Sequence, residues 1–226
     1  MKSSQSSLAV GLMSFALLLA PAAAQSQPDE AGARGGKPIR TMEEIRSEGV
    51  VRQRWDISCG AAALSTLLTY DFKDNTPETA IVVWILHRED AARVRARGGF
   101  SLLDLKRFAQ ARGYDAEGFS DMSLEELASQ KSSVIVPIRL KGFDHFVVVK
   151  GVSGDRVFLA DPGFGNVTMK TSRFVQIWKN GVVFIVHPPD ERMQVAKGVS
   201  ASARIIPDET LIARSIGVTL PSNALY

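Results

Sequence analysis

The sequence contains one cysteine, Cys59, and three histidines, so thiol chemistry is the first function to examine. A cysteine acts as a nucleophile in its thiolate form, and a histidine beside it can serve as its base. A single cysteine cannot form an intrachain disulfide, which leaves an idle buried thiol, an intermolecular disulfide or a nucleophile. In isolation the idle thiol would be favoured, but the neighbouring residues favour the nucleophile.

His145 is the best placed of the three histidines to act as the base. It starts a predicted strand directly after the loop 141–144, where its side chain can face a helix. His87 lies at a polar helix end and His187 precedes two prolines, so both are expected to be structural or exposed. A lone histidine is more often structural, but one opposite a cysteine at a helix start fits a nucleophile and its base.

Two further residues complete a candidate site. Asp161 ends a strand that pairs with the His145 strand through a hairpin at 153–155, so the antiparallel register brings it beside His145 to orient the imidazole. Taken by itself, Asp161 is equally well an Asp-Pro turn residue. Gln53 can donate a side-chain N–H to an oxyanion, with the backbone N–H of Cys59 as the second donor.

Four helices are predicted to position these groups in the first half of the domain. Ser58 is the expected N-cap of the first, which puts Cys59 at the first helical position, where the positive end of the helix favours a thiolate. The small residues after Cys59, Gly60 first, are expected to leave room for a substrate backbone. The other starts are Thr76 as cap with Pro77 in the first turn, Ser101 with Asp104, and Ser123 with Glu126.

The second half has the period of extended structure. Strands are predicted at 134–140, 146–149, 157–160, 167–170 and 182–186, with a turn of helix at 172–178. Pro137 indicates an edge strand or a bulge in the first of these. Helices first and antiparallel strands second predict an α+β domain.

The ends of the chain predict export. Residues 1–24 combine Lys2, an apolar run at 8–19 and three alanines, the pattern of a signal peptide cleaved after Ala24. The run is shorter than a membrane span, and no later segment is long and apolar enough, so no stable span is expected after cleavage. Residues 25–45 are predicted to be a flexible lead-in to a domain at 46–189, and 190–226 an extension that is either disordered or docked on it.

The charge pattern argues against a nucleic-acid partner. The formal net charge is +3, and it falls to +2 when the signal peptide with Lys2 is removed. The densest basic group is interleaved with Glu89 and Asp90, which is typical of a solvated helix face rather than of a phosphate-binding stripe. Its members are Arg88, Arg93, Arg95 and Arg97.

Three segments together resemble the peptidase C39 family, which includes the leader-processing domains of bacteriocin exporters. They are Gln53 to Leu64 (QRWDISCGAAAL), His145 to Val149 (HFVVV) and the Asp161-Pro162 pair. The stretches 99–105 and 174–181 resemble the family's second-helix region and closing segment. The resemblance covers the chain from residue 46 to residue 189.

The resemblance implies a papain-like fold and a thiol endopeptidase mechanism, with no metal or organic cofactor. Cys59 would attack the scissile carbonyl, His145 would protonate the leaving amine, and water would hydrolyse the thioester. Asp161 would orient His145, while Gln53 and the Cys59 amide would hold the oxyanion. The partner implied is a peptide or protein substrate.

Two departures from the family separate this chain from the exporter-linked members. Ser58 stands where an aspartate is common, and the chain is expected to be a stand-alone exported protein, in the periplasm or outside the cell. Such proteins resemble accessory factors encoded with surface fibre or amyloid secretion systems, which implies a co-exported substrate. Two other functions stay open, namely a catalytically silent peptide-binding module and a cell-wall amidase or acyl transferase.

Overall fold

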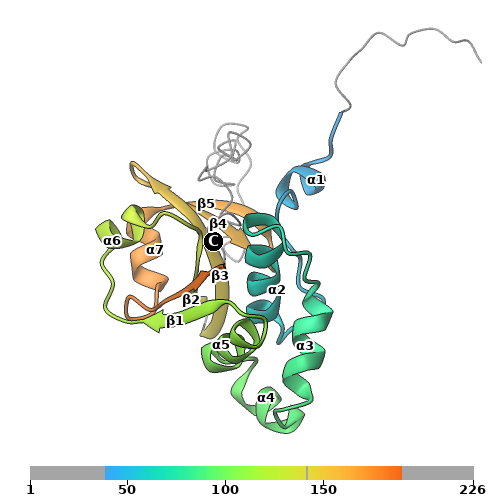
Figure 1. Ribbon diagram of the computed structural model, residues 1–226. Helices are drawn as coiled ribbons and strands as arrows, with labels where there is room; N and C mark the ends of the chain where they lie inside the picture. Colours follow the sequence, from blue (N-terminus) through green and yellow to red (C-terminus); the bar gives the residue numbers. More distant parts are fainter. Residues whose placement is uncertain (1–38, 141, 190–226) are drawn as a thin grey trace, which may run out of the picture. The chain divides into compact units, whose positions relative to one another are not determined.

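A six-stranded antiparallel sheet forms the centre of the structure, a computed structural model that describes residues 39–140 and 142–189 (Figure 1). The strand order is β1-β6-β2-β3-β4-β5. The predicted signal peptide, most of the lead-in and the extension at 190–226 lie outside the described residues. The strands are β1 (Asp115–Phe119), β2 (Val134–Leu140), β3 (Phe143–Ser153), β4 (Arg156–Asp161), β5 (Gly165–Lys170) and β6 (Val183–His187).

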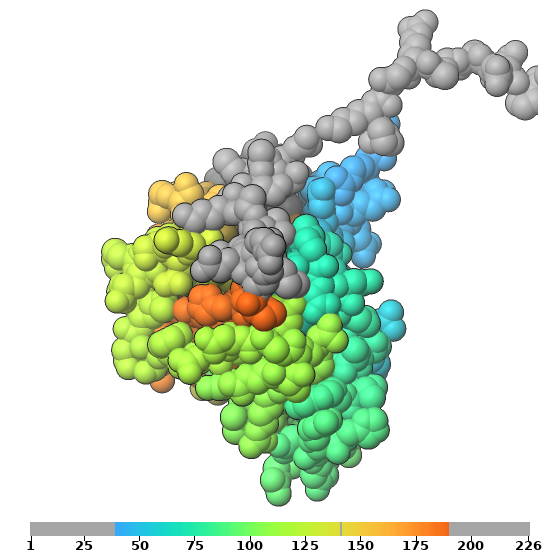
Figure 2. All heavy atoms as spheres, in the orientation of Figure 1, coloured from blue at the N-terminus to red at the C-terminus, as the bar shows by residue number. Residues whose placement is uncertain are grey.

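Helices cover both faces of this sheet. In the space-filling view, the yellow-green atoms of β1 lie directly beside the orange atoms of β6, and the teal atoms of the helices after Cys59 lie to their right (Figure 2). The α-helices are α1 (Met42–Arg46), α2 (Cys59–Thr66), α3 (Glu78–Leu86), α4 (Ala91–Arg97), α5 (Leu102–Ala111), α6 (Leu124–Ser129) and α7 (Thr171–Ile177). A π-helical turn, η1 (Leu67–Asp71), continues α2.

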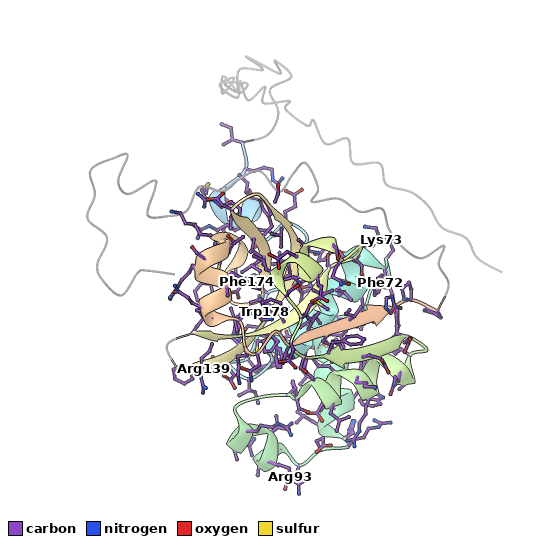
Figure 3. The ribbon with its side chains drawn as sticks, turned by 90° about the vertical axis from the view of Figure 1, so that its left-hand side faces the viewer. Phe72, Lys73, Arg93, Arg139, Phe174 and Trp178 are labelled. Atoms are coloured by element: carbon purple, nitrogen blue, oxygen red, sulfur yellow. The ribbon has the colours of Figure 1, made fainter. Side chains whose placement is uncertain are left out.

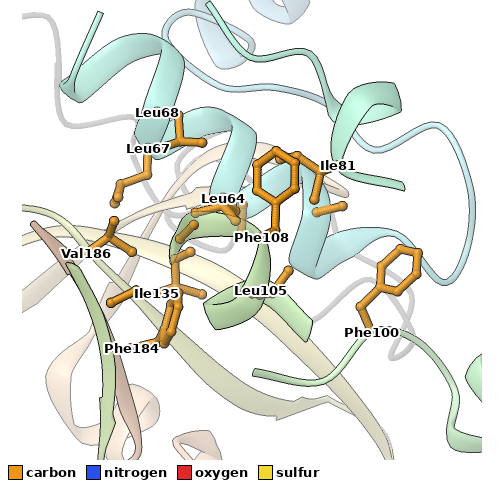
Figure 4. Close-up of a cluster of buried hydrophobic side chains, with 14 of the residues drawn as sticks. Leu64, Leu67, Leu68, Ile81, Phe100, Leu105, Phe108, Ile135, Phe184 and Val186 are labelled. Atoms are coloured by element: carbon orange, nitrogen blue, oxygen red, sulfur yellow. The ribbon is translucent and has the colours of Figure 1, made fainter. Parts of the chain in front are cut away.

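Successive side chains of the central strands point alternately into two hydrophobic cores, one on each face of the sheet. On one face, Leu64 of α2 and Leu105 of α5 gather over Ile135 of β2 (Figure 4). On the other face, Val134 and Val136 of the same strand belong to the core that α6 and α7 cover. There the rings of Phe174 and Trp178 pack 5.3 Å apart (Figure 3). Because adjacent residues of a strand point to opposite faces, this alternation fixes the register of the central strands.

The predicted helix starts are correct at three of the four positions. Ser101 with Asp104 and Ser123 with Glu126 form capping boxes, as predicted. Ser58 is the N-cap residue of α2, as predicted, but its hydroxyl makes no capping bond and donates instead to the Trp55 carbonyl at 2.8 Å. The N-cap of α3 is Pro77 rather than the buried Thr76, whose carbonyl accepts a bond from Ser65.

The lead-in ends earlier than predicted. Thr41 and Glu44 form a capping box that starts α1, so the helix occupies part of the segment 25–45 that was expected to be flexible. The chain after α1 then passes the start of β5, where the Asn166 side chain donates to the Glu48 carbonyl at 2.8 Å. The last residues of the predicted lead-in are therefore helical.

Pro137 lies in an interior strand, which corrects the prediction of an edge strand. β2 pairs with β3 along its whole length, but on its other side it pairs with β6 only at Ile135. Beyond that point the Pro137 carbonyl accepts a bond from the Lys179 backbone N–H at 3.1 Å. Pro137 has no N–H to donate, and this is tolerated because regular pairing between β2 and β6 has already ended at that position.

Besides α1, two elements were not predicted from the sequence. β1 is an edge strand in which Ala116 is the buried residue and the other four are exposed, so it lacks an alternating apolar pattern. α4 carries three of the four arginines expected on a solvated helix face, Arg93, Arg95 and Arg97, and its N-cap is Asp90, whose side chain accepts from the Ala92 N–H. β1 interrupts the predicted order of helices first and strands second, although the α+β class stands.

Gly165, the first residue of β5, lies against the backbone of Arg46 at the end of α1. Its replacement is expected to destabilise the protein. Its φ is +86°, and a Cβ there would lie 2.5 Å from the Arg46 carbonyl oxygen. Gly113 has almost the same φ, +85°, but no atom within 4 Å of its Cβ position. Gly113→Ala should therefore lower the free energy of unfolding by about 1 kcal/mol, from backbone strain alone.

Gly165→Ala should lower it by about 2 kcal/mol more, because overpacking adds to the strain. Chemical denaturation of the two variants measures the difference directly. Equal losses for the two variants would show that residue 46 does not pack against β5.

Candidate active site

Cys59 lies at the first helical position of α2, as predicted, and its side chain is buried. The helix packs on β3 at its second residue: a Cβ at Gly60 would lie 3.1 Å from the Phe146 ring. Gly60 was predicted to leave room for substrate, but its small size instead lets the start of α2 lie directly on β3. The thiol is thereby held one residue from a helix–strand contact.

His145 joins the thiol to a carboxylate. Its Nε2 lies 2.8 Å from Oδ1 of Asp161, and the two side chains are 16% and 3% exposed. The imidazole also has Cys59 as a hydrogen-bond and charge partner. Because Asp161 occupies Nε2, the other ring nitrogen, Nδ1, is the one left for the thiol.

Asp161 is both a turn residue and the partner of His145. It ends β4, and its Oδ1 accepts from the backbone N–H groups of Gly163 at 2.7 Å and Phe164 at 3.3 Å. The hairpin register pairs Val148 with Ala160, so the end of β4 returns beside the start of β3, as predicted. The two interpretations of Asp161 from the sequence are therefore compatible.

The two partners of His145 favour its charged form. Burial alone lowers the pKa of His145, but the hydrogen bonds with Asp161 and Cys59 and the charges of these groups outweigh it. The pKa rises from 6.5 to about 10. Since the folded-state pKa exceeds the unfolded one, protonated His145 stabilises the fold fully below about pH 6.5, and this contribution is lost as the pH rises through about 10.

Gln53 lies beside the turn that follows Asp161. Its backbone N–H donates to the Pro162 carbonyl at 2.9 Å, and its Nε2 donates to the Trp55 carbonyl at 3.0 Å. A Cβ built at Gly163 would lie 3.8 Å from Gln53 Oε1 and 3.9 Å from His145 Cε1, so the glutamine amide and the imidazole flank the same glycine. The bond to Trp55 orients the amide and uses one of its two hydrogens.

Two charged residues that the sequence did not single out hold the Gln53 loop. Arg52 donates to the carbonyls of Pro162 and Gly163. The buried Glu78 accepts the backbone N–H of Arg54, at 3.2 Å to each carboxylate oxygen. No local pattern in the sequence indicates either role, because the partners lie 24 to 111 positions away along the chain.

The remaining histidines lie apart from this cluster. His87 is the C-cap of α3 and His187 ends β6, and both are exposed, in agreement with the interpretation from the sequence. Among residues 39–140 and 142–189, no three His, Cys, Asp or Glu side chains gather in a way that could hold a metal ion. The described chemistry of the site is a thiol, an imidazole and a carboxylate in series.

The raised pKa of His145 gives a test of its bond to Asp161. In Asp161→Asn the main opposing effect, burial, should prevail, so the pKa of His145 should fall from about 10 to near or below its ordinary value of 6.5. Nuclear magnetic resonance of the imidazole during a pH titration measures this shift. A variant that still loses the His145 proton near pH 10 would contradict the assignment.

Asp144→Asn is the matched control for that titration. Asp144 adjoins His145 in sequence, but its carboxylate is half exposed and pairs with Lys179 at 2.6 Å and Arg139 at 3.4 Å. Its replacement should leave the pKa of His145 unchanged. A fall in the control equal to that in Asp161→Asn would mean that general loss of negative charge, and not the specific bond, sets the pKa.

Comparison with known proteins identifies a family and several relatives of this chain. Residues 47–191 match the model of the peptidase C39 family. The chain is 35% identical over 150 residues to the "Probable functional amyloid protease FapD" of Pseudomonas aeruginosa, and 35% identical over the same length to its namesake from Pseudomonas fluorescens. Each alignment covers 66% of this chain and 65% of the relative, so the chain spans just under two thirds of these relatives.

Solved structures agree on the fold. The peptidase domain of Streptococcus ComA superposes with a TM-score of 0.52 at 20% identity, over 62% of this chain and 97% of that domain. A double glycine motif protease from an AMS/PCAT transporter, solved with its leader peptide, gives 0.51 at 27% identity, over 62% of this chain and 90% of that one. The predicted α+β, papain-like fold is confirmed, and with the match over residues 47–191 the chain belongs to the peptidase C39 family.

Proposed function

We propose that this protein is an exported cysteine endopeptidase that cleaves a co-exported protein, with Cys59 as nucleophile and His145 as its base. The observation that carries this proposal is the 2.8 Å bond between His145 Nε2 and the buried Asp161, with Cys59 as the second partner of the same imidazole. A surface histidine would have no reason to be held between a carboxylate and a buried thiol. Membership of the C39 family supports the same chemistry.

The reaction follows from the order of these three groups. The Cys59 thiolate attacks the scissile carbonyl carbon, and the carbonyl π electrons move onto its oxygen. As the tetrahedral intermediate collapses, the C–N bond breaks and the His145 imidazolium gives its Nδ1 proton to the leaving amine, which produces a thioester. A water molecule then attacks the thioester while His145 accepts its proton, and the acid product leaves as the thiolate is restored.

Asp161 keeps its negative charge throughout these steps. Its Oδ1 is held by two backbone N–H groups, so it accepts from His145 Nε2 in a fixed direction and leaves Nδ1 facing the thiol. Gln53 and the Cys59 backbone N–H would receive the oxyanion. The Gln53 Nε2 bonds the Trp55 carbonyl and its Oε1 faces the turn at Gly163, so the second Nε2 hydrogen is the donor that would serve the oxyanion.

The substrate class and the location are part of the proposal. The names of the relatives point to peptide substrates, in one case a leader peptide and in another a functional amyloid system. The signal-peptide pattern at residues 1–24 supports export to the periplasm, and the described part of the chain contains no helix that could cross a membrane. We therefore favour a protein of a surface fibre or amyloid secretion system as the substrate.

The oxyanion role of Gln53 predicts different effects on two reactions of the same thiol. Gln53→Ala should lower kcat for peptide hydrolysis about 100- to 1,000-fold, because one donor to the oxyanion is lost. Alkylation of Cys59 by iodoacetamide forms no oxyanion, so its rate should change little. Parallel loss of both reactions would show that Gln53 supports the site structurally instead.

Comparison of exported proteins by mass spectrometry tests the function as a whole. Cells that carry Cys59→Ala should lose one defined cleavage in a co-exported protein, because the variant lacks the attacking sulfur. Asp144→Asn, which alters a half-exposed carboxylate beside the site, is the matched control and should retain the cleavage.

The other outcomes identify the competing functions. A folded and exported Cys59→Ala protein with unchanged cleavage of every co-exported protein would favour a silent peptide-binding module. Release of wall peptides from peptidoglycan fragments by the wild-type protein, with no protein cleavage, would favour the amidase.

A further inference from the structure

The candidate site is assembled from two parts of the chain that are far apart in sequence. Gln53 and Cys59 belong to the loop and helix of one segment, whereas His145 and Asp161 lie at the ends of β3 and β4. Besides the contact between Cys59 and His145, hydrogen bonds to the turn after Asp161 join these parts. Arg52 makes two of these bonds from its side chain.

The guanidinium of Arg52 holds the carbonyl ends of two consecutive peptide units. Its Nη2 donates to the Gly163 carbonyl at 2.5 Å and its Nε to the Pro162 carbonyl at 3.3 Å. The Gln53 N–H adds a third bond, also to the Pro162 carbonyl, at 2.9 Å. The Nη1 of Arg52 lies 3.5 Å from the Ser47 hydroxyl, and the side chain is half-buried.

The N–H ends of the same two peptide units hold Asp161. The unit that carries the Pro162 carbonyl carries the Gly163 N–H, which donates to Asp161 Oδ1 at 2.7 Å. The unit that carries the Gly163 carbonyl carries the Phe164 N–H, which donates to the same oxygen at 3.3 Å. Each peptide unit thus lies between a cation and a carboxylate, with its dipole aligned by both.

We propose that Arg52 is a positioning residue of the site, which acts on His145 through these two peptide units and Asp161. The series runs from the guanidinium through two backbone dipoles to Oδ1 of Asp161, and from there to His145 Nε2. Hydrogen bonds in such a series polarise one another, so each strengthens the next. This inference rests on the proposed thiol chemistry and adds a residue that sets its geometry.

The geometry explains why an arginine suits this position. Its planar fork presents several N–H groups in fixed directions and can reach both carbonyls, whereas a lysine ammonium acts as a single point charge. The turn has little room to shift, because a Cβ at Gly163 would lie 3.3 Å from Asp161 Oδ1. Without the guanidinium, the unit that carries the Gly163 carbonyl loses the bond that holds it and can withdraw the Phe164 N–H from Asp161, whereas the Gln53 N–H still holds the other unit.

A double-mutant cycle on the reactivity of the thiol tests the proposal. The probe is the rate of iodoacetamide alkylation of Cys59 at pH 6, where an ordinary thiol reacts slowly. Arg52→Met should lower this rate about 10- to 100-fold, since small displacements of a catalytic group have effects of that size. In an Asp161→Asn background the same substitution should change it less than about twofold, because the residue through which Arg52 acts is already altered.

The other results of this cycle have defined meanings. Equal losses in both backgrounds, or no loss in either, would overturn the proposal, because a merely structural role is independent of Asp161. Arg93→Met, an exposed arginine on α4 that lies away from Phe174 and Trp178, is the control and should leave both rates unchanged (Figure 3). If wild-type Cys59 reacts no faster than the denatured chain, the proposed function fails, which is a separate result.

A second variant keeps the test decisive if Arg52→Met does not fold. Arg52→Lys retains the positive charge and the reach to one carbonyl, and thermal unfolding checks its stability. It should lower the alkylation rate by less than Arg52→Met does, and again only when Asp161 is present. An Arg52→Lys protein with the wild-type rate would overturn the requirement for two held peptide units.

Discussion

The rest of the site depends on one oxygen atom, Oδ1 of Asp161. It receives two backbone N–H groups and the imidazole of His145, which makes a buried carboxylate acceptable at 3% side-chain exposure. A buried anion with fewer donors would be neutralised or would turn toward solvent. The turn after β4 is thus the feature that keeps a charged aspartate inside the domain, and the protonated histidine follows from it.

Close contacts at two glycines then bring together the parts of the chain that carry Cys59, His145 and Asp161. Gly60 allows α2 to lie on Phe146, one residue from His145, and Gly165 allows the chain near Arg46 to pass the start of β5. Both contacts bring parts of the chain together that are distant in sequence. A well-packed interior transmits small displacements, so an added methyl group at either glycine would move the elements that hold the site.

The sequence was sufficient for the elements whose signals are local. The capping boxes at Ser101 and Ser123, the helix start at Cys59 and the hairpin that returns Asp161 beside His145 all depend on neighbours within a few residues or on one short turn. β1 could not be predicted, because an edge strand with a single buried side chain has no alternating pattern.

The departures from these predictions have separate physical origins. Ser58 has the residue type of an N-cap, but its hydroxyl is used by the Trp55 backbone. Pro137 has the residue type of an edge strand, but its strand is interior, and regular pairing with β6 is missing only beside the proline.

The outer edges of the sheet lead to a different consequence: β1 exposes Asp115 and Glu117, and residues 46–48 cover the start of β5. Charged or covered edges resist pairing with foreign strands, so a protein that works among fibre-forming chains would be protected from being incorporated into the fibre.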